Sequence, residues 1–139
     1  MTYADTHVDT GGASKRLHVT LWTVQLVLAL VFVVTGSMKL TEPIGALPAS
    51  LAGIPLPLVR LIGVAELLGA AGLILPAATR IAPVLTPLAG LALTLVMLSA
   101  SLLHVARGEL TIALVPVVLG ALAAVVAWGR WRRAPLPAR

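Results

Sequence analysis

The hydrophobic residues of this chain form four long runs instead of alternating with polar residues. Each run contains at most one ionisable residue, and together they cover residues 17–38, 61–79, 81–106 and 110–129. A helix needs about 20 apolar residues to cross the hydrocarbon core of a bilayer. The pattern therefore predicts four transmembrane helices, at residues 18–38, 58–78, 82–106 and 110–130. Prolines inside these runs do not argue against helices, because membrane helices tolerate them.

The composition excludes a soluble domain. Apolar residues make up 59% of the 139 residues and charged residues 11%, against about 25% charged in typical soluble domains. Mean hydropathy is +1.03. We therefore expect an all-α integral membrane four-helix bundle with up-down-up-down topology, in which the bilayer is the solvent.

We expect one domain, residues 17–132, between a disordered tail at 1–16 and a second tail at 133–139. The first run is longer than the apolar region of a cleaved signal peptide, which spans about 7–15 residues. It also ends in Met38 and Lys39 and not in small residues, so we expect it to remain in the protein.

The distribution of lysine and arginine predicts the orientation. Seven of these residues lie at the termini or in the 79–81 turn, and three lie on the other side. The positive-inside rule then places both termini in the cytoplasm, with the protein in a bacterial inner (plasma) membrane. The basic C-terminal cluster reads as a topology anchor beside anionic lipid. Nucleic-acid binding is not expected, because no soluble module carries a basic face.

The polar residues of the predicted helices gather at the outer side of the membrane. Glu66 lies six residues past Arg60, which is about 9 Å into the helix, and Lys39 and His104 fall at similar depth on two other helices. An intramembrane glutamate normally faces the bundle and finds a partner, and Lys39 and His104 are the available partners. The opposite half of the bundle has almost no ionisable group, only His18 at its edge.

We expect these residues to form a polar pocket between helices 1, 2 and 3. Met97, Ser101 and His104 share one helix face by their spacing, and the small residues around Glu66 allow close helix approach. The candidate ligand-binding residues are Thr35, Lys39, Glu66, Ser101 and His104. Simpler interpretations stay open: Glu66 as a structural partner, His104 in the headgroup region, and Lys39 as a snorkelling anchor.

The connection at residues 40–57 is long for a bundle and contains four prolines and two glycines. Ile44, Leu47 and Leu51 are spaced by three and four, which predicts a short amphipathic turn or helix above the pocket. It could be a lid, or an interfacial loop without a gating role.

Several chemistries are excluded or unsupported. The chain has no cysteine, which excludes a dithiol relay, an iron–sulfur cluster and a thiolate metal site. His18 and His104 fall at opposite faces and cannot share a haem. One histidine and one glutamate fall short of a zinc or di-iron ligand set, so no metal is expected. A channel would need a polar stripe through the full depth.

Four segments of the chain resemble the DoxX-like family of small four-helix bacterial membrane proteins. They are LVFVVTGSMKL at residues 30–40, LIGVAELLGAAGLILP at 61–76, MLSASLLHVARGE at 97–109 and AWGR at 127–130. The resemblance covers about residues 20–132. Lys39, Glu66 and His104 match positions where the family places polar residues.

What the resemblance implies about activity is limited. Some relatives are linked to quinone-coupled thiosulfate oxidation and others to oxidative stress, and we do not transfer the thiosulfate activity.

One hypothesis is a redox-accessory module that binds a quinone or a similar amphiphile at the polar layer. The alternative is a non-catalytic structural or partner-binding subunit, in contact with a redox subunit or with a second copy of the chain. Whether the protein is an enzyme, and which residues would be catalytic, stays open. A transporter is disfavoured, because four helices without an internal repeat leave little to alternate.

Overall fold

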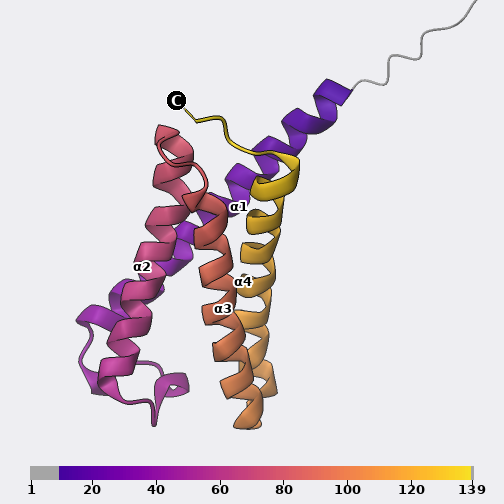
Figure 1. Ribbon diagram of the computed structural model, residues 1–139. Helices are drawn as coiled ribbons and strands as arrows, with labels where there is room; N and C mark the ends of the chain where they lie inside the picture. Colours follow the sequence, from indigo (N-terminus) through magenta and orange to yellow (C-terminus); the bar gives the residue numbers. More distant parts are fainter. Residues whose placement is uncertain (1–9, 139) are drawn as a thin grey trace, which may run out of the picture.

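The computed structural model describes residues 10–138 and contains only helices over that range (Figure 1). The long helices are α1 (Thr10–Thr41), α2 (Leu56–Thr79), α3 (Leu85–Ala106) and α4 (Leu110–Trp128). A single π-helical turn, η3 (Gly129–Arg133), continues α4, and two short 3₁₀ turns, η1 (Ile44–Ala46) and η2 (Ala49–Leu51), lie between α1 and α2. The all-α class and the four helices predicted from the sequence are confirmed.

The starts of two helices differ clearly from the sequence prediction. Helix α1 begins at Thr10, so residues 10–16 are helical instead of part of a disordered tail; residues 1–9 of that predicted tail lie outside the described range. Helix α3 begins at Leu85 and not at residue 82. Arg80 and Ala82 both have left-handed backbone angles, with φ of 60° and 48°, and this reversal delays the start of α3.

The exterior of the bundle matches lipid. All four helices are long and apolar enough to cross a membrane, and α3, with 22 residues, extends over about 33 Å. Large apolar side chains such as Leu30, Leu68 and Leu102 point outward and are more than 60% exposed. In water this surface would be unfavourable, whereas in a bilayer it needs no cover. The chain is a multi-pass membrane protein.

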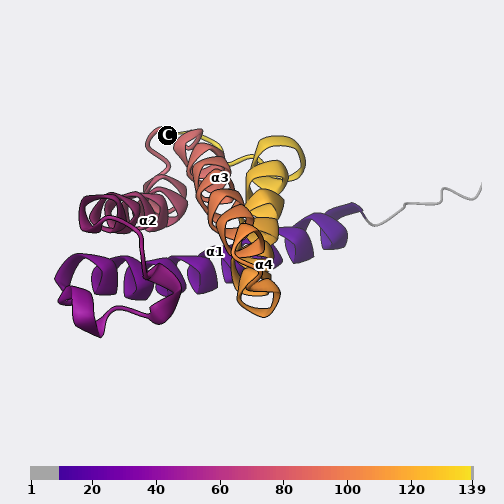
Figure 2. The same ribbon diagram turned by 90° about the horizontal axis from the view of Figure 1, so that it is seen from below.

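The helices form two antiparallel pairs, α1 with α2 and α3 with α4. The pairs lie close together where the chain termini and the α2–α3 turn are found, and they diverge toward the opposite end (Figure 1; Figure 2, seen from below). We call these the termini end and the loop end; the loop end carries residues 42–55 and 107–109.

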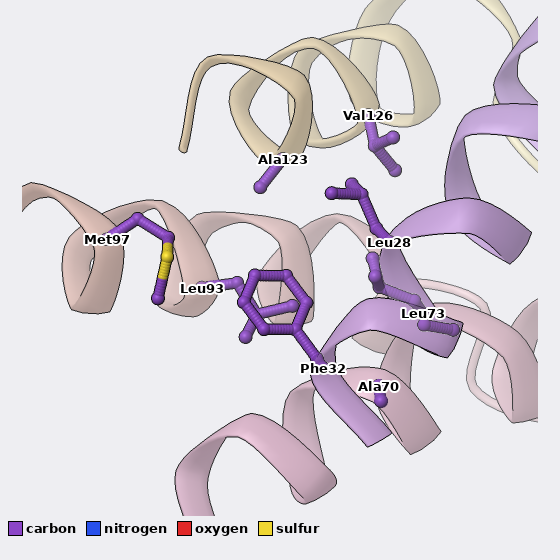
Figure 3. Packing of buried hydrophobic residues seen from close by; sticks show 9 residues of the cluster. Leu28, Phe32, Ala70, Leu73, Leu93, Met97, Ala123 and Val126 are labelled. Carbon is purple, nitrogen blue, oxygen red and sulfur yellow. The ribbon is translucent and has the colours of Figure 1, made fainter. Parts of the chain in front are cut away.

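A compact apolar core joins the two pairs in the middle of the bundle. Phe32 of α1 is 1% exposed and lies among side chains from the other helices (Figure 3). The other members of the cluster are Leu28, Ala29, Ala70, Leu73, Leu93, Met97, Ala123 and Val126. This core closes the bundle on the termini-end side of Phe32, so the divergence of the pairs is confined to the loop end.

Candidate functional site

The divergence of the helix pairs leaves a cavity of about 850 Å³ at the loop end. All four long helices and residues 50–55 contribute to its walls, which are mainly apolar. Phe32 and Met97 form its floor against the core. Cavities that bind small molecules usually measure about 300–1,000 Å³ and combine apolar walls with a few polar groups, and this cavity fits that description.

An ion pair between Lys39 of α1 and Glu66 of α2 borders the cavity. Lys39 Nζ donates to both carboxylate oxygens of Glu66, at 3.0 and 2.8 Å, and the Thr35 hydroxyl donates to Glu66 at 3.2 Å. Glu66 is only 3% exposed. The three acceptor contacts compensate its burial, as a carboxylate in a membrane interior requires. Lys39 therefore turns inward to Glu66, and the alternative of a snorkelling anchor does not hold.

A close contact between two glycines allows this ion pair. Gly36 precedes Lys39 by three residues and Gly63 precedes Glu66 by three residues, so each is one turn away from its charged neighbour. A Cβ on Gly63 would lie 2.9 Å from the Gly36 carbonyl oxygen and from the Lys39 Cβ. Small residues at a crossing bring two backbones together, and here they bring Lys39 within reach of Glu66.

His104 lies on the α3 side of the cavity and pairs with a different carboxylate. Its Nδ1 is 2.6 Å from an oxygen of Glu109, which immediately precedes α4. No hydrogen bond joins His104 to Glu66 within residues 10–138, so the expected Glu66–His104 partnership is not formed. The chain turns tightly between the two helices at Gly108, whose φ is +74°, and this turn brings Glu109 back to His104. The sequence analysis did not name Glu109 as a partner of His104, although its position five residues after His104 was a usable signal.

Ser101 shares the buried face of α3 with Met97 and His104, as its spacing predicts. Its hydroxyl donates to the Met97 carbonyl of its own helix, at 2.8 Å. Of the five candidate ligand-binding residues, four line the cavity, namely Thr35, Lys39, Glu66 and His104. Ser101 is not among the described residues that line it. The hydroxyl of Ser101 therefore donates within its own helix and does not face a ligand in the cavity.

The segment between α1 and α2 covers the cavity and is fastened by two arginines. Arg60 donates to the carbonyl oxygens of Lys39 and, at 2.8 Å, of Glu42. Arg107, at the end of α3, donates to the carbonyls of Ser50 and Ala52 at 3.0 and 2.9 Å. The predicted amphipathic element is thus two 3₁₀ turns. The carbonyls that bind the arginines of α2 and α3 lie at the end of α1 and in the segment that contains these turns.

A second polar cluster at the termini end was not predicted from the sequence. Arg130, which the sequence analysis assigned to a basic anchor, is only 2% exposed, and Gln25 is fully buried. Arg130 Nε donates to Gln25 Oε1 at 2.6 Å, and Gln25 Nε2 donates to the Leu73 carbonyl at 2.6 Å. The sequence analysis named only His18 at the edge of this half, and the structure adds Arg130 of η3 as a buried ionisable group. An uncharged glutamine in an otherwise apolar helix was the signal available.

Fold and site together define a small four-helix integral membrane protein with a polar-lined cavity at one end. The model of the DoxX-like family matches residues 23–126, which is more than half of the chain, and the chain belongs to this family. Comparison with curated proteins and with solved structures gave no significant match.

Within the described residues, no three side chains of His, Cys, Asp or Glu are grouped so that they could hold a metal ion. The chemistry that the described site offers is instead a cation–carboxylate pair, a histidine–carboxylate pair and a large apolar volume between them. Such an arrangement suits the binding of a molecule with a polar head and an apolar body.

Proposed function

We propose that the protein binds a quinone or a similar amphiphile in the loop-end cavity and serves as a redox-accessory module of the membrane. The observation that carries the proposal is the cavity itself. It has a volume of about 850 Å³, mainly apolar walls and two separate pairs of ionisable side chains at its border.

The two pairs suit the two ends of a quinone head. Lys39 and the Thr35 hydroxyl, which donate to Glu66 in this structure, would turn toward a quinone oxygen near one wall, and His104 supplies a ring nitrogen near another. A bound quinone supplies electron transfer coupled to proton uptake. His104, held at Nδ1 by the part-exposed Glu109, is placed to exchange a proton between the cavity and water at the loop end. A quinone-binding module would also suit the link of some relatives to oxidative stress.

The setting that we propose is a bacterial plasma membrane with both termini in the cytoplasm. The greater number of lysines and arginines at the termini end supports this orientation. The loop-end cavity would then lie in the outer leaflet. Reporter fusions at the C-terminus and in the 42–55 segment would test the orientation independently of any ligand.

The test of binding is the quinone content of the purified protein. Protein isolated in native-lipid particles is extracted, and quinones are quantified by mass spectrometry for wild type, Glu66→Gln and His104→Gln. Glu42→Gln is the matched control, because Glu42 lies at the same end but does not line the cavity. We expect about one quinone per chain in wild type and control and at least a tenfold loss in the other two variants.

A cavity-filling variant separates binding from stability. Ala100 lines the cavity and carries no polar group, so Ala100→Phe should leave both ion pairs intact while it occludes the volume. Loss of quinone in a folded Ala100→Phe protein supports the proposal. Equal quinone content in wild type, Glu66→Gln and Ala100→Phe would refute it.

The second candidate is a structural or partner-binding subunit without a ligand. It is favoured by the direct bridge that Lys39 and Glu66 make between α1 and α2, since this bridge explains the buried carboxylate without a bound molecule. It predicts that Glu66→Gln lowers stability or assembly while no amphiphile is found. Native mass spectrometry that shows only a monomer without partners would count against it.

A further inference from the structure

Within the part of the chain that the structure describes, Arg130 is a buried cation that pairs with no carboxylate. The carboxylates of the described range belong to Glu42, Glu66 and Glu109, and all three lie at the loop end. Arg130 lies at the other end and is 2% exposed. A buried charge is normally paired or fully hydrogen-bonded, because its desolvation is otherwise too costly.

The neutral neighbours of Arg130 do not satisfy its hydrogen-bonding groups. A guanidinium has five N–H donors. Nε reaches Gln25 Oε1 at 2.6 Å, whereas Nη2 is buried and has no hydrogen-bond partner among residues 10–138. The Trp22 ring, centred 5.6 Å from the guanidinium carbon, offers cation–π attraction but no acceptor for these donors.

The contact of Nη1 with His18 is also incomplete. Nη1 lies 3.1 Å from His18 Nδ1, while Trp22 Nε1 donates to His18 Nε2 at 3.1 Å. A neutral imidazole accepts at only one ring nitrogen, so His18 cannot accept from both donors. Among the described residues, Gln25 is thus the one acceptor of Arg130 that no second donor competes for.

A second cavity adjoins this arginine. It has a volume of about 200 Å³, several times the ~30 Å³ that a water molecule occupies in the liquid. Besides Arg130, its lining residues are Pro83, Val84, Pro87, Trp131, Pro135 and Leu136. The Ala134 amide bonds the Gly129 carbonyl at 2.8 Å, and the chain then runs back toward the α2–α3 turn (Figure 1). Pro135 and Leu136 of this segment line the cavity.

We propose that this cavity binds a phosphate group, with Arg130 as its main ligand. The planar fork of a guanidinium matches two phosphate oxygens, and the anion would supply the charge and the acceptors that Arg130 lacks. The same chemistry has two sources, the headgroup of an anionic lipid at the membrane surface and free phosphate.

The site is independent of the loop-end cavity and of any quinone. Its test uses the full chain in zwitterionic detergent, with thermal unfolding and native mass spectrometry as readouts. The probes are phosphatidylglycerol, phosphatidylcholine as the lipid whose phosphate is neutralised by its own choline and has no net charge, and inorganic phosphate against chloride at equal ionic strength. The variants are Arg130→Gln and the matched control Arg133→Gln, which removes the same charge from an exposed position nearby.

We expect phosphatidylglycerol to raise the melting temperature and to remain bound in the mass spectrum of wild type and Arg133→Gln. Arg130→Gln should bind it at least tenfold more weakly. Protection by inorganic phosphate alone would assign the site to free phosphate, and protection by phosphatidylglycerol alone would assign it to a lipid headgroup; both support a phosphate site. No effect of either probe, or an equal loss in both variants, would overturn it.

A second variant keeps the proposal testable if Arg130→Gln does not fold. Leu136→Trp places a larger side chain in the cavity while Arg130, Gln25 and His18 remain. We expect it to melt at the wild-type temperature without a probe and to lose the response to phosphatidylglycerol. A full response in Leu136→Trp would show that the anion binds elsewhere and would refute the assignment to this cavity.

Discussion

Arg130 and Gln25, which are 105 residues apart in the chain, are joined by a hydrogen bond of 2.6 Å inside the bundle. Gln25 also bonds the Leu73 carbonyl, so one amide side chain links α1 to both α2 and η3, the turn that continues α4. This bridge lies at the termini end, whereas Lys39 and Glu66 link α1 to α2 at the loop end. Helix α1 is therefore held by polar contacts on both sides of the apolar core.

Gln25→Leu should destabilise the protein by about 2–3 kcal/mol, because it leaves the buried Arg130 Nε without its acceptor and removes the side-chain donor to the Leu73 carbonyl. The measurement is the free energy of unfolding in mixed micelles titrated with dodecyl sulfate. Thr23→Val is the matched control, since the Thr23 hydroxyl is exposed and bonds only the Val19 carbonyl of its own helix. We expect a change within about 0.5 kcal/mol for the control; equal effects of both variants would contradict the bridge.

Glu66→Gln should cost about 3 kcal/mol, because it leaves the part-buried Lys39 ammonium without its counter-charge. The double variant Lys39→Met/Glu66→Met should regain most of this loss, since apolar replacement of both members of a buried pair is often neutral. The same dodecyl sulfate titration measures both. A double variant that is less stable than Glu66→Gln would show that the attraction between Lys39 and Glu66 stabilises the bundle. The cost of leaving Lys39 without a counter-charge would then not account for the whole effect.

The double variant also distinguishes a structural pair from a binding pair. Under the quinone proposal, a stable Lys39→Met/Glu66→Met protein loses its quinone. Retention of quinone in that protein would mean that Lys39 and Glu66 have a structural role alone.

Gly63→Ala should separate α1 from α2 and destabilise the bundle by about 1–3 kcal/mol, as overpacking does. The new Cβ would meet the Gly36 carbonyl and the Lys39 Cβ at 2.9 Å, and neither belongs to the end of a flexible side chain. Gly45→Ala is the control, because a Cβ there meets nothing within 4 Å. Thermal unfolding compares the two variants, and a stable Gly63→Ala protein would contradict the tight crossing.

Arg107→Gln should loosen the cover of the loop-end cavity, because it removes the two hydrogen bonds to the Ser50 and Ala52 carbonyls. We expect amide hydrogen exchange at residues 49–54 to rise about fivefold, which corresponds to the loss of about 1 kcal/mol. Exchange in the centres of the four helices should not change.

Arg132→Gln, an exposed arginine at the other end of the bundle, is the control for this exchange measurement. It should leave residues 49–54 as in wild type. If the two variants exchange alike in that segment, Arg107 does not fasten it.

The sequence by itself determined the four helices. In a bilayer every backbone N–H and C=O must be paired inside the protein, so an apolar run of sufficient length is helical whatever its neighbours are. The same reasoning allowed the grouping of Lys39, Glu66 and His104 at one depth, because depth follows from the rise along a helix. The four segments that resemble the DoxX-like family lie in these helices or at their ends.

Only the tertiary structure decided which polar groups meet. The depth of a residue does not fix its direction around the helix axis, and that direction, together with the crossing of α1 and α2 at Gly36 and Gly63, selects Lys39 as the partner of Glu66. His104 bonds Glu109 because the turn at Gly108 is tight. Arg130 is buried because Gln25 lies opposite it on a helix far away in the sequence. Such choices depend on packing between helices, which the pattern along one chain does not contain.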